Sequence, residues 1–153
     1  HFAELNEGFA AYKAGAHRHA PEIEQVLSDI AGKETKITFV PHLLPVNRGI
    51  LSTVYVKNRG YELEDIHRIY TGYYKDAMFV KVLKLGEYAN IRDVRLTNMC
   101  RISLHEDKHT GVLVITSAID NMVKGASGQA IQNLNLVFGL PEDEGLKSTA
   151  PAF

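Results

Sequence analysis

Met99-Cys100-Arg101-Ile102-Ser103-Leu104-His105 and Val112-Leu113-Val114-Ile115-Thr116-Ser117-Ala118 are two alternating, largely apolar runs on either side of a polar segment that ends in a glycine, Glu106-Asp107-Lys108-His109-Thr110-Gly111. Strand-like runs joined by a short polar turn that contains glycine are typical of a β-hairpin. The sequence therefore predicts a β-hairpin of two antiparallel strands, over 99–105 and 112–118.

Strand-like and helix-like segments alternate along the rest of the chain. We expect further strands at Phe9–Lys13, Lys36–Leu44, Ile50–Lys57 and Phe79–Leu83. Apolar residues at helical spacing predict helices at Glu22–Ala31, Leu63–Lys75 and Ser127–Phe138. Gly86–Leu96 reads as a surface loop, and residues 139–153 as a frayed C-terminal tail. The predicted fold class is α+β, a mixed or antiparallel sheet with helices on one face, in a single domain over 1–153.

Composition excludes several classes of function. With 153 residues and 45% hydrophobic content, the chain can build one substantial core. A formal net charge of −1 argues against a nucleic-acid-binding surface, and no apolar run is long enough to span a bilayer. A single cysteine, Cys100, excludes an internal disulfide and fits a reducing, cytoplasmic compartment. Because Cys100 lies in an alternating strand, we expect it to be structural.

The segment His17-Arg18-His19-Ala20-Pro21-Glu22 brings two imidazoles and a guanidinium to the start of the first predicted helix. Pro21 suits the first helical position. Ala20 would then be the cap, and it cannot accept the free backbone N–H groups as Ser, Thr, Asp or Asn would. We expect an open, positive helix end, where imidazoles could move protons near neutral pH. The alternative is a solvated loop beside a weakly capped helix.

Two more segments join this motif: Phe39–Ile50, a proline-rich corner containing Arg48, and Asp120–Ala130, a glycine-rich entry to the last helix. With His-Arg-His-x-Pro-Glu-Ile, they occur in the order seen in N-acetyl-γ-glutamyl-phosphate reductases, which the chain resembles over nearly its whole length. The resemblance implies the substrate domain of a glyceraldehyde-3-phosphate dehydrogenase-like protein. It also implies reduction of N-acetyl-glutamyl 5-phosphate to the semialdehyde and phosphate, with NADP(H), in arginine biosynthesis.

Two features of that family are missing from this sequence. A Gly-x-x-Gly-x-x-Gly turn for the dinucleotide is absent, and Cys100 does not match the position of the nucleophilic cysteine. We therefore expect a substrate-binding and dimerisation domain without its nucleotide-binding domain. Such a fragment would be inactive alone and would bind no cofactor. Its expected partners are the acyl phosphate, the missing domain and a second copy through the sheet, with no nucleic acid and no membrane.

The resemblance also suggests roles for individual residues. His17 is the candidate acid/base and His19 the second candidate, and spacing alone does not separate them. Arg48 could hold a carboxylate or phosphate in a bidentate fork, or form a surface salt bridge. Arg18 ranks below it, because in an extended segment it would point away from both histidines. Lys124, Gly125, Ala126, Ser127 and Gly128 are expected beside the cofactor, where glycine-rich backbone could cradle phosphate or pack on a planar ring.

Two other functions remain as alternatives, and a metal site must also be weighed. An aspartate-semialdehyde dehydrogenase would share the fold and the Cys–His chemistry. A free-standing oligomerisation or anion-binding module would need no nucleotide domain. His17, His19 and His42 could supply three imidazoles to a zinc ion, but a fourth ligand and supporting carboxylates are not indicated, so we expect no metal.

Overall fold

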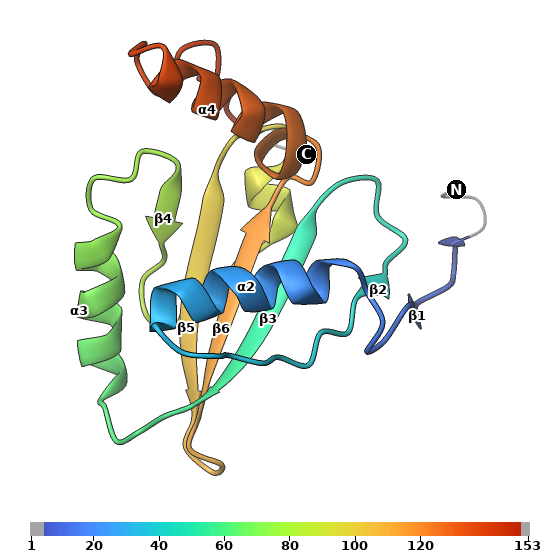
Figure 1. Cartoon of the computed structure of the whole chain (residues 1–153), viewed down its shortest axis with the longest axis vertical. Helices are drawn as coiled ribbons and strands as arrows, with labels where there is room; N and C mark the ends of the chain where they lie inside the picture. The colour runs from blue at the N-terminus through green and yellow to red at the C-terminus, as the bar shows by residue number, and fades with distance from the viewer. Residues whose placement is uncertain (1–4, 151–153) are drawn as a thin grey trace. The chain divides into compact units, whose positions relative to one another are not determined.

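The computed structural model describes residues 5–150 and divides the chain into two compact units, residues 1–47 and 48–153. Figure 1 shows the elements of each. The single domain expected over 1–153 stays a prediction.

The first unit contains helix α2 (His19–Ala31) and a short antiparallel pair, β1 (Ala10–Ala11) with β2 (His42–Leu43). The helix ends at Gly32, whose φ of 63° is the left-handed conformation that glycine adopts without strain. It begins at His19 rather than at Glu22. The prediction that Ala20 is the cap and Pro21 the first helical residue is therefore wrong.

Most of the strand predicted at Lys36–Leu44 is not part of a sheet. Only His42–Leu43 pairs, and Phe9–Lys13 is reduced in the same way to Ala10–Ala11. This segment does not pair as a strand because its backbone hydrogen-bonds to side chains. The Ile37 N–H donates to the Glu24 carboxylate at 3.1 Å. The segment after α2 is thus extended but bonded to side chains of the helix.

The second unit is organised by a sheet with strand order β3-β6-β5-β4. Its strands are β3 (Ile50–Lys57), β4 (Val80–Val82), β5 (Cys100–Asp107) and β6 (Val112–Ile119). β6 pairs antiparallel with both β3 and β5, and β4 lies parallel to β5. The predicted hairpin and the α+β class are confirmed, and the sheet is mixed.

The hairpin turn is held by the carboxylate of Asp107. It accepts hydrogen bonds from the His109 N–H at 3.0 Å and from the Thr110 hydroxyl at 2.7 Å. Gly111 follows with a φ of 67°, which a side chain would resist. Local chemistry therefore sets the register in which Asp107 faces Val112.

Helix α3 (Leu63–Tyr73) packs against β4 and β5, and a 3₁₀ turn, η1 (Ile91–Val94), packs against β6. Leu104, Val94 and Ala118 are buried in this core. The prediction of a surface loop over Gly86–Leu96 is wrong, because Val94 is fully buried and Ala89 nearly so. Only two or three apolar side chains in this polar segment reach the core. They are too few to form a periodic pattern that would indicate burial.

The chain then passes through a π-helical turn, η2 (Val123–Ser127), into α4 (Gly128–Val137). Figure 1 shows α4 beyond the end of the sheet at which β6 finishes. The segment after α4 is not frayed within the described residues. Leu146 is buried, and the Ser148 hydroxyl donates to the Leu96 carbonyl at 2.8 Å. Residues 151–153 of the expected tail lie outside the described residues.

Candidate functional site

His17 lies in the first unit among three other rings. Its ring centre is 4.8 Å from that of His19, 5.3 Å from that of Phe39 and 5.5 Å from that of Tyr12. Its Nδ1 accepts a hydrogen bond from the His19 backbone N–H at 3.2 Å. A neutral imidazole that accepts at Nδ1 carries its proton on Nε2. Nε2 is therefore the atom through which His17 could exchange a proton.

Burial lowers the pKa of His17 below its usual value, and the positive charges of His19, Lys13 and Arg18 lower it further. The neutral form is favoured at neutral pH as a result. With Nδ1 engaged in this way, the neutral ring offers a hydrogen-bond donor at Nε2.

The start of α2 is less open than the sequence suggests. The His19 N–H donates to the His17 ring, the Ala20 N–H donates to the His17 carbonyl at 3.0 Å, and Pro21 has no N–H. Few backbone donors are left for an anion in this first turn. The open, positive helix end expected from the sequence is therefore not supported.

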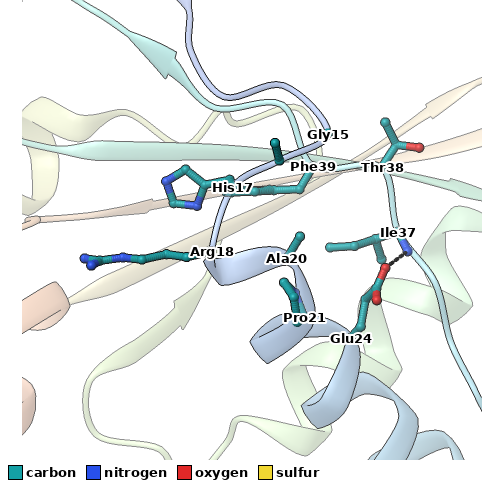
Figure 2. A pocket seen from close by; sticks show the side chains of 10 residues that line it. Gly15, His17, Arg18, Ala20, Pro21, Glu24, Ile37, Thr38 and Phe39 are labelled. Carbon is teal, nitrogen blue, oxygen red and sulfur yellow. Dashed lines mark hydrogen bonds between the residues drawn. The ribbon is translucent and has the colours of Figure 1, made fainter.

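A shallow, open hollow of about 470 Å³ lies along this part of the first unit (Figure 2). Figure 2 shows the side chains of His17 and Arg18 extending to the same side. The expectation that they point apart is wrong, because Arg18 has helical backbone angles (φ −58°, ψ −23°) and the alternation of an extended chain does not apply. The hollow is lined by residues on either side of the start of α2 and by the segment that follows the helix: Gly15, Ala16, His17, Arg18, Ala20, Pro21, Glu24, Ile37, Thr38 and Phe39.

His42, the third imidazole of the zinc alternative, has other contacts. Its Nδ1 is 3.1 Å from the Val40 carbonyl, and its ring stacks on Phe9 with centres 5.2 Å apart.

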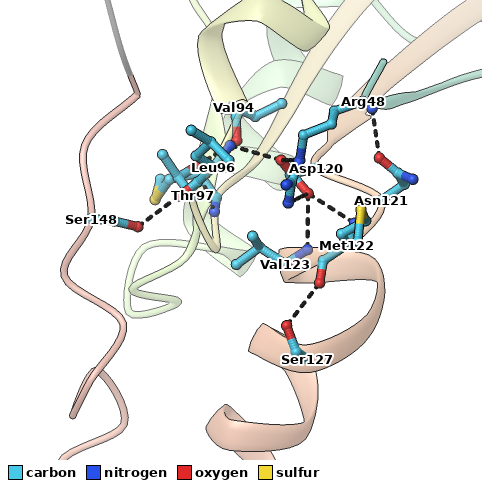
Figure 3. Close-up of polar contacts among 12 residues, drawn as sticks. Arg48, Val94, Leu96, Thr97, Asp120, Asn121, Met122, Val123, Ser127 and Ser148 are labelled. Carbon is cyan, nitrogen blue, oxygen red and sulfur yellow. Dashed lines mark hydrogen bonds and ion pairs between the residues drawn. The ribbon is translucent and has the colours of Figure 1, made fainter. Parts of the chain in front are cut away.

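Arg48 makes its bidentate fork with a carboxylate of the chain itself (Figure 3). Its Nε donates to Asp120 Oδ2 at 2.9 Å and its Nη2 to Oδ1 at 3.0 Å. The Arg48 side chain keeps 23% of its surface exposed, whereas that of Asp120 is fully buried. Arg48 and the two histidines belong to different units of the chain.

Asp120 accepts three backbone hydrogen bonds as well: from Leu96 at 2.7 Å, from Met122 at 2.8 Å and from Val123 at 2.9 Å. Burial alone would raise its pKa. The Arg48 guanidinium and the three N–H groups outweigh burial and lower the pKa of Asp120 to about 2. One carboxylate therefore joins the corner before β3, the strained residue Leu96 (φ 61°) and the turn that begins η2.

The glycine-rich stretch from Lys124 to Gly128 uses its own backbone donors. The N–H groups of Gly125, Ser127 and Gly128 bond to the carbonyls of Asp120, Met122 and Val123. Few backbone N–H groups are left to bind a phosphate. The expectation that this stretch cradles phosphate is therefore not supported. Gly125, Ala126 and Ser127 are exposed, and a surface of small residues fits packing against a flat ring.

Sequence reasoning missed Asp120 and did not weigh Glu24 or Gln132. Asp120 had a recognisable signal, since an Asp after a strand commonly accepts the N–H groups that follow it. The contact of Glu24 with Ile37 joins separate segments and leaves no local pattern. Cys100 lies half-buried on β5, with its Sγ 3.6 Å from the Ser117 hydroxyl.

Residues 1–121 match the family described as "semialdehyde dehydrogenase, dimerisation domain". This chain belongs to that family. Among curated proteins, it is 59% identical to the N-acetyl-gamma-glutamyl-phosphate reductase of Brachyspira hyodysenteriae, over 100% of this chain and 44% of that protein. It is 57% identical to the protein of that name from Clostridium beijerinckii, over 100% of this chain and 45% of the relative. The chain thus spans less than half the length of these relatives.

Solved structures support the fold of this semialdehyde dehydrogenase dimerisation domain. An aspartate semialdehyde dehydrogenase from Francisella tularensis aligns with a TM-score of 0.65 at 16% identity, covering 88% of this chain and 40% of that one. Aspartate semialdehyde dehydrogenase II from Vibrio cholerae aligns with a TM-score of 0.63 at 16% identity, covering 80% and 37%. Within residues 5–150, no helix has the length and apolar character needed to cross a bilayer.

Proposed function

We propose that this chain is the substrate-binding and dimerisation part of a cytoplasmic N-acetyl-γ-glutamyl-phosphate reductase. The observation that carries the proposal is identity of 59% and 57%, over the whole chain, to two proteins of that name. The proposed reaction reduces N-acetyl-glutamyl 5-phosphate to N-acetylglutamate 5-semialdehyde and releases phosphate. Aspartate semialdehyde dehydrogenases share the fold at only 16% identity, which supports no choice of substrate.

In this proposal His17 is the acid/base, with His19 as the second candidate. To take a proton from the attacking thiol, which the resembled family supplies from upstream of the region matched by this chain, His17 would first change tautomer. Nδ1 would release the His19 N–H and hold the ring proton, so that Nε2 could accept. It would later give a proton to the substrate oxygen that becomes negative when hydride arrives, and take that proton back as the thiolate leaves and the aldehyde forms. The depressed pKa of His17 favours the first of these steps, since the unprotonated ring is the one that accepts.

Two cations are proposed to recognise the anionic substrate. Arg18 lines the hollow together with His17, and its side chain extends to the same side as that of His17. Arg48 already spends Nε and one hydrogen of Nη2 on Asp120, so the donors it could offer are those of Nη1 and the second hydrogen of Nη2. A guanidinium fixed by its own carboxylate loses less freedom on binding substrate than a mobile one.

NADP(H), when bound, supplies the hydride. The residues of this chain that fit it are Gly125, Ala126 and Ser127, whose exposed small side chains could approach a flat ring. The phosphates would have to be held by residues other than these, because the backbone donors of η2 are already bonded.

The test is reconstitution. This chain is mixed with the separately expressed remainder of the Brachyspira hyodysenteriae relative and assayed with N-acetylglutamate semialdehyde, phosphate and NADP. We expect no turnover with either part alone and turnover with both. Turnover with aspartate semialdehyde instead would favour the aspartate enzyme. Binding of the two parts without turnover on either substrate would favour a non-catalytic oligomerisation or anion-binding module.

A further inference from the structure

The turn that opens α4 has one side chain directed inward. Lys124 is half-buried, whereas Gly125, Ala126 and Ser127 are exposed. Its Nζ donates to Gln132 Oε1 at 2.6 Å and lies 5.5 Å from the centre of the Phe79 ring. This ammonium group is bound within the unit rather than offered to a ligand.

Gln132 is buried and uses both ends of its amide. Oε1 accepts a second hydrogen bond, from Asn98 Nδ2 at 2.9 Å, and Nε2 donates to Glu142 Oε1 at 2.6 Å. A neutral amide thus connects the positive Lys124 to the negative Glu142. Since every bond has a distinct donor and acceptor, the orientation of Gln132 is determined by its neighbours.

Asn98 brings this cluster against the first residue of α4. Its Oδ1 is buried without a hydrogen-bond partner among the described residues. The same atom lies 2.4 Å from the place that a Cβ on Gly128 would occupy. Such close approach is possible only because residue 128 is glycine. The segment before β5 and the start of α4 are therefore held in direct contact.

We infer that Lys124 is a positioning residue: through Gln132 it holds η2 in the conformation that presents Gly125, Ala126 and Ser127 outward, and it is not a ligand for an anion. The conformational part of this inference stands on the second unit alone. Its consequence for the cofactor rests on the proposed function.

Three variants separate positioning from simple loss of packing. Lys124→Met removes the charge and keeps the chain length. Gln132→Leu removes both ends of the amide. The paired change Gln132→Glu with Glu142→Gln exchanges the two groups, so that Glu at 132 still accepts from Lys124 and Asn98 while Gln at 142 donates to it. Lys108→Met, in the exposed hairpin turn, is the matched control.

Hydrogen exchange of the whole chain measures the conformation of η2. In Lys124→Met and Gln132→Leu we expect the amides of Gly125, Ser127 and Gly128 to exchange at least about tenfold faster, with β5 and β6 amides unchanged. In the exchanged pair and in the control they should keep wild-type rates. Wild-type rates at η2 in Lys124→Met overturn the inference. If Gln132→Leu does not fold, the paired change Gln132→Glu with Glu142→Gln still tests the inference. The inference is overturned if amide exchange at η2 is accelerated in that pair as much as in Lys124→Met.

The reconstituted enzyme gives a second readout. If Lys124 acts through Gln132, either single change raises KM for NADP by about tenfold, changes kcat less, and the double variant is no worse than either. Additive losses, or a rise in KM confined to Lys124→Met, would show that Lys124 binds the cofactor directly and overturn the inference. Absence of turnover in the unaltered complex counts against the proposed function and leaves the exchange result standing.

Discussion

The side chain of Asp120 joins Arg48, Leu96 and the turn after β6. Its pKa is about 2 in the folded chain against 3.8 ordinarily. A depressed pKa means that the ionised carboxylate stabilises the fold above pH 4, and this contribution is lost as the pH falls from about 4 to 2. A shift of this size corresponds to about 2 kcal/mol of unfolding free energy.

We expect Asp120→Asn to lower the unfolding free energy by about 2–3 kcal/mol at pH 7, since it leaves the half-buried Arg48 without its partner charge. It should also flatten the loss of stability between pH 4 and 2. Urea denaturation across that range measures both effects. Asp76→Asn, which changes an exposed carboxylate, is the control and should leave the profile unaltered. If Asp120→Asn loses as much unfolding free energy between pH 4 and 2 as the wild type does, the assignment of this pH dependence to Asp120 is contradicted.

His17 makes a prediction that two methods can check. Nitrogen NMR should find the neutral ring protonated at Nε2, with a pKa below the ordinary value of a histidine. In the reconstituted enzyme, His17→Ala should lower kcat by about 10²-fold or more and change KM less, because general acid–base help is lost. His109→Ala is the control. A loss carried by His19→Ala alone would transfer the role to the second candidate.

Among the elements, α3 and α4 each contain a glycine whose surroundings differ. A Cβ on Gly128 would lie 2.4 Å from Asn98 Oδ1 and 2.7 Å from Val123 Cγ1, whereas one on Gly72 would meet nothing within 4 Å. We expect Gly128→Ala to destabilise the chain by about 2 kcal/mol or more through overpacking. Gly72→Ala should stabilise it by about 0.5–1 kcal/mol. Thermal denaturation of the two variants, compared with wild type, gives opposite shifts, and shifts of the same sign would contradict this account.

Elements that carry local signals could be predicted from the sequence. The hairpin was found because Asp107 and Gly111 define its turn, and α3 because its apolar residues recur at helical spacing. The start of α2 was misplaced because an imidazole, from His17, supplies the cap in place of the usual residue types. Gly86–Leu96 was misread because Val94 is buried by tertiary contacts that leave no periodic pattern.

The candidate site was predictable to the same extent. His17 and Arg18 were found by motif and do line one hollow. The partner of Arg48 was not found, because Asp120 lies far from it in sequence and pairs with it only after β3 and β6 have aligned. The resemblance alone puts Lys124 beside the cofactor, whereas in the folded chain its ammonium group turns inward to Gln132.

For the whole molecule, the family indicates self-association, and the edge strand β3 offers a surface for it. Every residue of β3 is exposed, including Leu51, Val54 and Tyr55. Isolated chains rarely leave so continuous an apolar strand uncovered. We propose a twofold dimer through the sheet.

Sedimentation over a wide concentration range tests the dimer. We expect dimers at micromolar concentration and at least about tenfold weaker association for Leu51→Lys, because a charge would be buried in the interface. Lys57→Arg, at the end of the same strand, keeps its charge and is the control. A strict monomer at high micromolar concentration would count against the proposal.

The antiparallel pairing of β6 with two partners also sets the order in which this chain can fold. Asp107 meets Val112 across a short turn, whereas Ile50 must find Ile119 across a loop that contains α3, β4 and η1. Closing the longer loop costs more chain entropy, so the β5–β6 hairpin should form before β3 joins it. In stopped-flow experiments we therefore expect Thr110→Ala, which weakens the hairpin turn, to slow refolding. Val54→Ala, on β3, should chiefly accelerate unfolding. Until β3 joins the sheet, the outer edge of β6 has unpaired backbone groups, so a chain that folds during its synthesis would expose an open sheet edge for that time.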